Sequence, residues 1–207
     1  MSLAARAPEA RRQLILDAAC EVLRERGFAG ARVTDIADRA GTSSGLVVYH
    51  FGTLQALLAA AVTRVEEDFY ANLTRRLGGT APPLLRLRYC AEFSAEDGRA
   101  LGDWVLWMEI WVQAVRDEKA RACREQLDRR LRDTLREIIE DGCNEGTFSC
   151  VDPTASAARL ASLVDGLAVQ LTLQDPAMRS DRMVRLWLEA AAYEVGVDVE
   201  MFDKLTP

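Results

Sequence analysis

The stretch VTDIADRAGTSSGLVVYHF, residues 33–51, predicts two short helices joined by a tight turn. Thr34 is a good N-cap for the first helix, because its hydroxyl can accept a backbone N–H at the helix start. Gly41 is expected to end that helix, since glycine readily adopts the left-handed conformation found after helix C-termini. Ser43 or Ser44 then caps the second helix. Two short helices around a central glycine form the pattern of a helix-turn-helix.

The second of these helices has the composition of a surface that meets DNA. A longer amphipathic helix is expected over residues 9–26, and Ile36, Ala37 and Val47 would pack the pair against it. The side chains expected to face outward are Ser43, Ser44, Leu46, Tyr49 and His50. In a helix-turn-helix this helix lies in the major groove, with its N-terminus toward base edges and phosphates. Hydroxyls and histidine can donate to phosphate oxygens, and leucine can contact a thymine methyl.

The rest of the chain predicts further helices, which makes the protein all-α with about nine helices. Apolar residues recur with a helical period, and segments rich in Gly and Pro, such as GGTAPP at residues 78–83, separate them. The helices expected beyond the helix-turn-helix cover residues 54–77, 83–96, 100–116, 117–144, 154–174 and 179–195.

The composition is typical of a folded globular protein. Of the 207 residues, 49% are hydrophobic and 28% are charged, and no apolar run approaches the roughly 18 residues that a transmembrane helix needs. The N-terminus lacks the apolar stretch of a secretory signal, so we expect a cytoplasmic protein without a membrane partner. The five cysteines contain no Cys-x-x-Cys pair, which favours free buried thiols over a metal site.

Charge is distributed unevenly along the chain. The net charge is −6, but residues 1–53 hold seven Arg against six Asp and Glu, while residues 54–207 carry a net charge of −7. The acidic bulk argues against nucleic-acid binding over the whole surface. The less acidic N-terminal segment can still bind DNA locally.

Aromatic residues of the middle helices are candidates for a ligand cavity. Four large side chains recur at the i, i+3, i+4 and i+7 positions of one helix face: Trp104, Trp107, Met108 and Trp111. Neighbouring helices would add Phe69, Tyr70, Tyr89, Cys90 and Phe93. The candidate polar contacts are Glu109 and Gln170. Such a set suits an aromatic or cationic small molecule. The alternative is that the tryptophan stripe only packs the core.

The last two expected helices form the natural surface for a homodimer. Their apolar residues could build a four-helix seam across a two-fold axis: Leu160, Leu163, Val164, Leu167, Leu171, Leu186, Trp187 and Ala190. The alternative is a core within one chain. A helix that is apolar on almost every side, as at residues 154–174, favours both roles.

These motifs together resemble the TetR/AcrR family of transcriptional repressors. The resemblance is specific over about 50 residues and rests on LILDAA at residues 14–19, GF at 27–28, VTDIA at 33–37, AG at 40–41, SSG at 43–45, YHF at 49–51 and LL at 57–58. The later segments WVLWMEIW at 104–111, RRL at 129–131 and LVDGL at 163–167 resemble BetI-type members.

The resemblance implies a DNA-binding domain over residues 1–53 and a helical ligand-binding and dimerisation domain over residues 54–207. It implies a ligand-responsive regulator that binds a palindromic double-stranded operator as a homodimer and is released by a small-molecule effector. The family's DNA contacts carry onto Thr34, Ser43, Ser44, Gly45, Leu46, Tyr49, His50 and Thr53. The BetI-like segments suggest a quaternary ammonium effector.

The sequence departs from the family at two positions near the expected DNA contacts. The family often has lysine where this chain has Ser44 and Leu54, and both differences remove a charge that would contact phosphate. Arginines at positions 11, 12, 32 and 39 could compensate. The sequence therefore predicts a shallower salt dependence of DNA binding than is usual for the family.

Two other functions are worth weighing against the regulator. The letters G-x-S-x-G occur at residues 41–45 with His50 nearby, but a nucleophile elbow needs a preceding strand and this one follows an expected helix. We therefore expect no enzyme, no catalytic residue, no metal site and no cofactor. The second alternative is a helical small-molecule-binding protein without specific DNA binding, which the low positive charge near Ser44 and Leu54 would favour.

Overall fold

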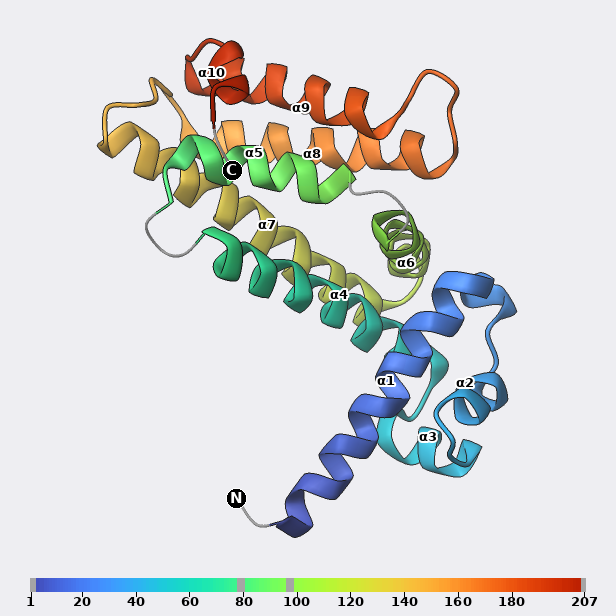
Figure 1. Ribbon diagram of the computed structural model, residues 1–207. Coiled ribbons are helices and arrows are strands. Elements are labelled where there is room, and N and C mark those ends of the chain that lie inside the picture. The colour runs from blue at the N-terminus through green and yellow to red at the C-terminus, as the bar shows by residue number, and fades with distance from the viewer. Residues whose placement is uncertain (1–2, 78–80, 96–98, 206–207) are drawn as a thin grey trace. The chain divides into compact units, whose positions relative to one another are not determined.

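The computed structural model describes residues 3–77, 81–95 and 99–205. Within these ranges the chain forms helices and no strand, which confirms the all-α prediction (Figure 1). The described ranges hold ten helices, one more than expected. The additional one is α10 (Glu200–Asp203), a single turn that is too short to show a helical period in the sequence.

The other nine helices follow the order expected from the sequence. They are α1 (Leu3–Gly30), α2 (Val33–Arg39), α3 (Ser44–Phe51), α4 (Leu54–Leu77), α5 (Pro83–Ala95), α6 (Arg99–Ala114), α7 (Glu118–Asn144), α8 (Pro153–Thr172) and α9 (Ser180–Val195). Most boundaries lie within two residues of the predicted ones, because Gly, Pro and capping residues mark them.

The first three helices form the helix-turn-helix with its supporting helix. α1 is interrupted at Gly27, whose φ of 65° and ψ of 174° lie outside the helical region. α2 packs against α1 and α3. The prediction that Thr34 caps α2 is wrong: the extended residue before the helix is Arg32, so Thr34 is already inside it. Gly41 ends the turn after α2 with a φ of 61°, as expected.

Packing divides the chain into two compact units. The N-terminal unit comprises residues 1–66 and 105–124, and the C-terminal unit comprises residues 67–104 and 125–207. Three helices, α4, α6 and α7, therefore contribute to both units. The boundary between a DNA-binding domain at 1–53 and a ligand domain at 54–207 concerns function rather than packing, and it stays a prediction.

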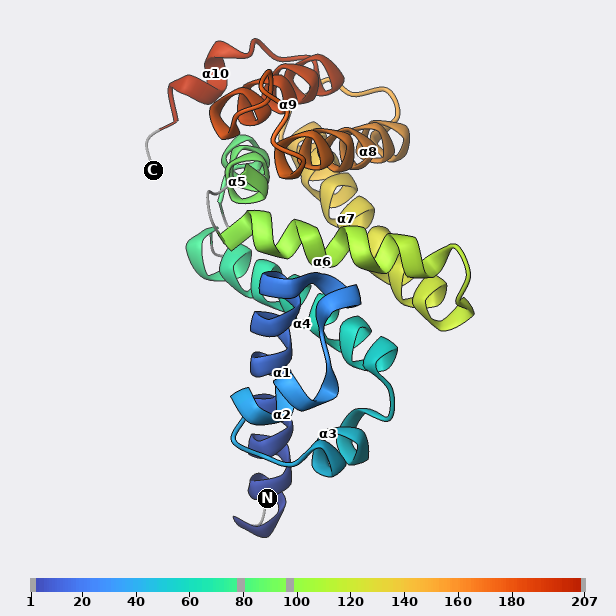
Figure 2. The ribbon, with the colours of Figure 1, turned by 90° about the vertical axis from the view of Figure 1, so that its right-hand side faces the viewer.

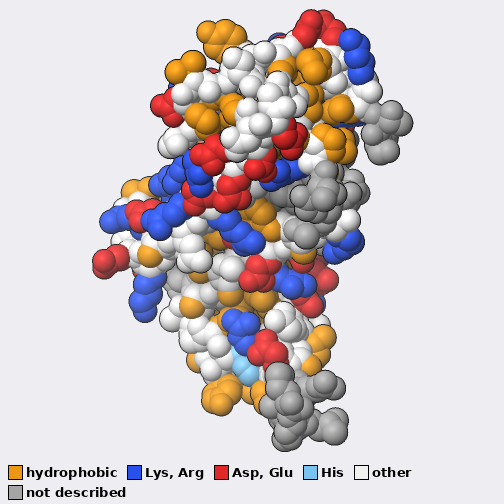
Figure 3. All heavy atoms as spheres, turned by 90° about the vertical axis from the view of Figure 1, so that its left-hand side faces the viewer, with side chains coloured by type: hydrophobic (Ala, Val, Ile, Leu, Met, Phe, Trp, Pro, Cys, Tyr) orange, Lys and Arg blue, Asp and Glu red, His pale blue; other side chains and the backbone are white. Residues whose placement is uncertain are grey.

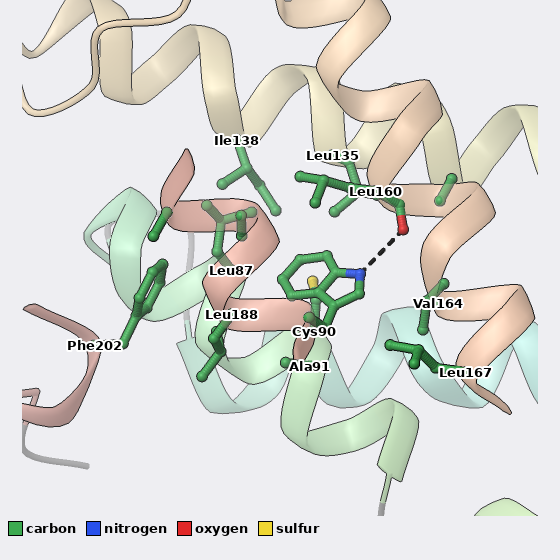
Figure 4. Packing of buried hydrophobic residues seen from close by; sticks show 14 of the residues in the cluster. Leu87, Cys90, Ala91, Leu135, Ile138, Leu160, Val164, Leu167, Leu188 and Phe202 are labelled. Atoms are coloured by element: carbon green, nitrogen blue, oxygen red, sulfur yellow. Dashed lines mark hydrogen bonds between the residues drawn. The ribbon is translucent and has the colours of Figure 1, made fainter. Parts of the chain in front are cut away.

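The core of the C-terminal unit lies between α5, α7, α8 and α9 (Figures 1 and 2). Figure 4 shows Leu87 and Cys90 of α5 facing Leu135 and Ile138 of α7, with Leu160 of α8 beside them. Burial of Cys90 raises the pKa of its thiol to about 12. This cysteine is therefore protonated and inert at neutral pH.

The predicted dimer seam is wrong for most of its residues. Five of them are buried within one chain and cannot meet a partner: Leu160, Val164, Leu167, Leu171 and Trp187. Leu163, Leu186 and Ala190 are only half-buried. When almost every side of a helix is apolar, its sequence period does not reveal which side faces the core of the same chain. In α8 the side that faces this core carries Leu160, Val164, Leu167 and Leu171.

The surface carries charges of both signs. Acidic and basic side chains lie interspersed on the face shown in Figure 3. Among the described residues, no single helix combines the length and apolarity needed to cross a membrane. Residues 44–51 and 54–72, taken together across a 70° bend, meet that test by length and composition only.

Candidate nucleic-acid interface and effector residues

The face of α3 that points away from the N-terminal core carries two large exposed side chains. Tyr49 is 80% exposed and Val48 is 49% exposed, whereas Val47 between α3 and its neighbours is buried. The predicted outward residues Leu46 and His50 are half-buried, and Gly45 is exposed. An exposed ring and an apolar side chain on a polar protein's surface are suited to contact with base edges and thymine methyls.

Sequence reasoning missed Val48 as a surface residue. The prediction that Val47 lies in the packed face is confirmed, but its neighbour Val48 is missing from the predicted outward residues. The helical period does distinguish the two valines, because Val47 follows the N-cap Ser43 by four residues and lies on the same side of α3 as that junction. Val48 is turned away by 100° and faces outward with Tyr49.

The N-terminus of α3 is capped in the way the sequence predicts. The Ser43 hydroxyl accepts a hydrogen bond from the backbone N–H of Leu46 over 3.3 Å. Its O–H remains a donor, and the N–H groups of Ser44 and Gly45 belong to the first turn, which has no helical acceptors. Donors grouped at a helix N-terminus form a site that favours phosphate oxygens.

The two threonines that resemble family DNA contacts have different local roles. Thr53 caps α4, since its hydroxyl accepts the backbone N–H of Ala56 over 3.1 Å, as the resemblance implies. Thr34 is exposed in the first turn of α2. Neither hydroxyl is buried, and both can donate to phosphate.

A row of rings and one cation lies along the C-terminal part of α3. The Tyr49 and His50 rings meet edge to face with centroids 5.2 Å apart, and the His50 and Phe51 rings lie 6.4 Å apart. The Arg12 guanidinium of α1 lies 4.9 Å from the centroid of Phe51. This contact fixes the stem of Arg12 beside α3 and holds one positive charge at the end of the helix.

Arg39 is engaged within the protein, which corrects its role as a compensating charge. Its guanidinium forms two hydrogen bonds of 2.7 Å with the carboxylate of Glu25 and a longer one of 3.5 Å with Glu21. The hydrogen bond to Glu25 raises the pKa of Arg39, and the same bond lowers the pKa of Glu25. A charge neutralised in this way adds little to the attraction for phosphate. Arg11 and Arg32 are exposed on the surface.

The aromatic residues predicted for an effector site fall into both packing units. In the C-terminal unit, the Tyr89 and Phe93 rings lie 5.8 Å apart on α5. The Trp104 indole N–H donates to the carbonyl of Ser94, next to Phe93, over 2.9 Å. These three rings therefore belong to one neighbourhood. Trp104 also packs against the buried core, so its role is structural at least in part.

Two further predicted residues of the C-terminal unit lie elsewhere. The Arg130 guanidinium of α7 lies 3.8 Å from the centroid of the Tyr70 ring. Gln170 is exposed on α8. This face of the Tyr70 ring is therefore already covered by a cation of the chain itself.

The remaining predicted effector residues belong to α6 in the N-terminal unit. The Trp107 and Trp111 rings pack 6.4 Å apart, one turn from each other, and Met108 is half-buried. Glu109 of the same helix accepts the backbone N–H of Phe28, so its carboxylate serves the N-terminal unit. The side chain of Phe69 lies outside the described residues.

The described residues contain no cluster of His, Cys, Asp and Glu side chains that could hold a metal ion. The Gly41–Gly45 segment, which has the letters of a nucleophile elbow, follows helix α2 rather than a strand. Its serine Ser43 is occupied as a helix cap. The Gly41–Gly45 segment therefore lacks the preceding strand that a nucleophile elbow requires.

Comparisons with known proteins agree with this arrangement. The family model of bacterial regulatory proteins of the tetR family matches residues 15–61, and that of the BetI-type transcriptional repressor C-terminal domain matches residues 85–195. The HTH-type transcriptional regulator BetI of Burkholderia ambifaria is 30% identical over 165 residues, which cover 77% of this chain and 80% of that protein.

The similar solved structures are likewise those of transcriptional regulators. A transcriptional regulator from Saccharomonospora viridis in complex with choline has a TM-score of 0.82 and 25% identity, covering 90% of this chain and 98% of that one. A TetR-family regulator from Rhodococcus sp. has a TM-score of 0.78 and 26% identity, covering 89% and 98%. This family is one of transcriptional regulators rather than enzymes. The chain belongs to the TetR family, with a BetI-type C-terminal domain, and is a ligand-responsive, DNA-binding transcriptional regulator.

Proposed function

We propose that the protein is a repressor that binds a palindromic operator as a homodimer and is released by a small quaternary ammonium compound. The observation that carries the DNA-binding part is the outward face of α3, where Tyr49 is 80% exposed beside the exposed Val48. A ring this exposed contributes little to the fold, and its position on a recognition helix gives it a role in contacting bases.

The proposed DNA contacts divide into positioning and base-reading groups. Phosphate oxygens meet the N-terminus of α3 and the flanking hydroxyls, which are provided by Thr34, Ser43, Ser44, Gly45 and Thr53. Base edges meet the outward face of α3, with Leu46, Val48, Tyr49 and His50 as the contacting residues. The phosphate contacts fix the position of the protein along the duplex, and the base contacts determine which DNA sequence it prefers.

Selection from a random pool of duplexes tests this part directly. We expect wild-type protein to enrich a palindrome whose half-sites are centred roughly one helical turn, about 34–36 Å, or a multiple of it apart. Tyr49→Ala should lose the enrichment, and Val151→Ala, which alters a fully exposed side chain outside the helix-turn-helix, should retain it. Failure of folded wild-type protein to enrich any sequence would contradict the operator and leave a ligand-binding protein without specific DNA binding.

The homodimer is proposed to form through the outer faces of α8 and α9, which lie side by side in Figures 1 and 2. Leu173 is 65% exposed just beyond α8, and Tyr193 is 87% exposed on α9. Half-buried Leu163 and Leu186 extend the apolar surface between them. Exposed apolar side chains of this size lose contact with water when a second copy covers them.

Gly166 gives a clean test of the dimer because a Cβ placed there meets no atom of its own chain within 4 Å. Gly166→Arg should keep the helical fold and shift the sedimentation coefficient from dimer to monomer. Gly45→Ala, at a glycine outside these helices where a Cβ would make only ordinary contact with Ser43 Oγ at 3.9 Å, serves as the control and should stay dimeric. A dimeric Gly166→Arg protein would contradict this interface.

The effector is proposed to be a quaternary ammonium compound bound by rings of the C-terminal unit. Support comes from the neighbouring rings of Tyr89, Phe93 and Trp104 and from the similar regulator whose structure contains choline. Aromatic faces attract such cations through their quadrupole.

Calorimetric titration with choline and with 3,3-dimethyl-1-butanol separates charge from shape, because the alcohol has the same outline without the positive charge. We expect choline to bind at least about tenfold more tightly than the alcohol, which corresponds to about 1.4 kcal/mol of cation–π attraction. Phe93→Ala should weaken choline binding. Equal affinities for the two molecules would contradict a cation-selective site.

A further inference from the structure

A hydrogen bond joins α6 to the end of α1 within the N-terminal unit. The backbone N–H of Phe28 donates to Oε1 of Glu109 over 2.9 Å, although the two residues are 81 positions apart in the chain. Glu109 is half-buried, so this contact is partly shielded from water. The carboxylate predicted as a polar contact for the effector is thus engaged by the backbone of the N-terminal unit.

The Phe28 N–H needs an acceptor from outside its own helix. Gly27 breaks the helical path of α1 with a φ of 65°, and a new turn starts at Phe28, whose carbonyl accepts the N–H of Ala31 over 3.3 Å. The first N–H groups of a helical turn have no helical acceptor. The Glu109 carboxylate fills this place, and a charged acceptor forms a stronger hydrogen bond than a neutral one.

Gly27 leaves room for this arrangement. A Cβ at that position would lie 3.1 Å from the same Oε1 of Glu109, tighter than ordinary van der Waals contact. The positive φ also disfavours any residue with a side chain. The glycine therefore serves both the turn and the approach of the carboxylate.

The turn at Phe28 is tied to the helix-turn-helix by ion pairs on either side of the α1–α2 junction. Arg26 contacts Asp35 over 3.0 Å, and Glu25 contacts Arg39 over 2.7 Å. These pairs link the last residues of the long part of α1 to both ends of α2, which packs on α3. A displacement of this turn therefore shifts α2 and α3 with it.

The α6 helix presents Glu109 and two rings on different faces. At 100° per residue, Glu109 lies about 160° around the helix from both Trp107 and Trp111. Leu106 and Ile110 are almost fully buried on the side between them and anchor the helix in the N-terminal core. A rotation or shift of α6 thus moves the rings and the carboxylate together, because a helix is stiff over two turns.

We propose that Glu109 is a positioning residue for DNA binding: its carboxylate holds the Phe28 turn and thereby sets the placement of α2 and α3. The inference rests on the proposed operator binding. In this proposal, the hydrogen bond between Glu109 of α6 and the Phe28 backbone N–H keeps the Phe28 turn in place.

Amide hydrogen exchange tests the contact itself. Labelling with ¹⁵N-phenylalanine gives signals from only six residues, and Phe28→Leu assigns the one of interest. In Glu109→Ala, exchange of the Phe28 amide should accelerate by at least about tenfold, as expected for loss of a hydrogen bond to a charged group. Glu109→Gln keeps an acceptor oxygen and should largely restore protection. The amides of Phe148 and Phe202, which are bonded in the C-terminal unit, report any general loosening.

Operator affinity tests the consequence. Glu109→Ala removes a negative charge, as does Glu125→Ala at an exposed site, so the comparison of the two variants controls for the change in net charge, which alone would strengthen DNA binding. We expect Glu109→Ala to bind the selected operator at least about fivefold more weakly than Glu125→Ala, at the lower end of typical coupling between sites. Glu109→Gln should bind within about twofold of Glu125→Ala.

The outcomes are distinguishable. Equal operator affinities for Glu109→Ala and Glu125→Ala, or unchanged Phe28 exchange in Glu109→Ala, would overturn the role of Glu109 and leave the proposed operator binding intact. A wild-type protein that selects no duplex would overturn the operator binding, and the positioning role with it.

Discussion

The indole N–H of Trp187 on α9 donates to the backbone carbonyl of Leu160 on α8 over 3.0 Å, within the buried core of the C-terminal unit (Figure 4). About one turn away along α8, the Glu194 carboxylate of α9 accepts the hydroxyl of the buried Ser156 over 2.6 Å. α8 and α9 are therefore joined by a neutral hydrogen bond at Trp187 and by charged ones at Glu194, which also accepts from Arg159 of α8. Both helices also carry the proposed dimer surface, so their alignment matters for assembly.

Trp187→Phe should destabilise the protein. The substitution removes the hydrogen bond to Leu160 and leaves a space beside it, because Trp187 is only 2% exposed. Together these losses should lower the free energy of unfolding by about 1–3 kcal/mol. Urea unfolding followed by circular dichroism measures the change. Val151→Ala, at a fully exposed position, should stay within about 0.5 kcal/mol of wild type, and an equal loss in both variants would contradict this account.

Glu194 should make stability depend on pH in the acid range. The hydrogen bonds from Arg159, and then that from Ser156, hold the pKa of Glu194 below its ordinary value. A carboxylate with a lowered folded-state pKa stabilises the fold above its unfolded-state pKa, near 4.3, and that contribution is lost as the pH falls through the folded-state pKa.

Glu194→Gln should therefore have a lower urea midpoint than wild type at pH 7, and the difference should stay constant down to about pH 5 and shrink below about pH 4. Glu200→Gln, at an exposed site, should match the pH profile of wild type. A difference between wild type and Glu194→Gln that does not change with pH would mean that the carboxylate's charge is not what stabilises this junction.

Gly142→Ala should be destabilising even though alanine is the better helix former. A Cβ at Gly142 would lie 2.0 Å from Cδ2 of Phe148, whose ring is buried against the end of α7. The ring cannot move away without disturbing the core, so we expect a loss of about 1–3 kcal/mol. Adding Phe148→Leu should recover part of it in the same unfolding measurement. Full stability of Gly142→Ala would show that the ring has room to move.

Much of the fold is predictable because particular residues of the sequence mark where helices begin and end. Gly27, Gly41, Ser43 and Gly52 mark the ends of the first three helices because each supplies a conformation or an acceptor that a helix end requires. The start of α2 could not be read in this way, since Arg32 precedes the helix without a capping bond. α10 lacked any period to detect.

The candidate site was predictable where local pattern decides it and not where tertiary packing does. Ser43 and Thr53 cap helices as expected. The pairing of Arg39 with Glu25, in contrast, joins two helices whose facing sides no local period specifies. Trp104 belongs to the C-terminal packing unit, whereas Trp107 and Trp111 belong to the N-terminal one. Tertiary packing decides this division, and the helical period of α6 does not show it.

Salt dependence of operator binding should be shallow. Arg39 is already paired with Glu25, and Ser44 and Leu54 carry no charge, so few cations meet phosphate. The slope of log affinity against log salt concentration should correspond to fewer than about eight phosphate contacts. Ser44→Lys and Leu54→Lys should each steepen it by about 1.8, because each adds one phosphate contact of about 0.9 in both subunits of the proposed homodimer. A wild-type slope steeper than this limit would contradict the neutralised role of Arg39.

The central claim, that α3 reads DNA sequence, is tested most directly by fluorescence anisotropy of wild-type protein on the selected duplex and on a scrambled duplex of equal length. We predict that wild type prefers the selected duplex by at least about 10³-fold at physiological salt, the usual lower range for specific regulators. Tyr49→Ala should lose most of that preference while retaining its affinity for the scrambled duplex. Equal affinity of wild type for the two duplexes would contradict the claim.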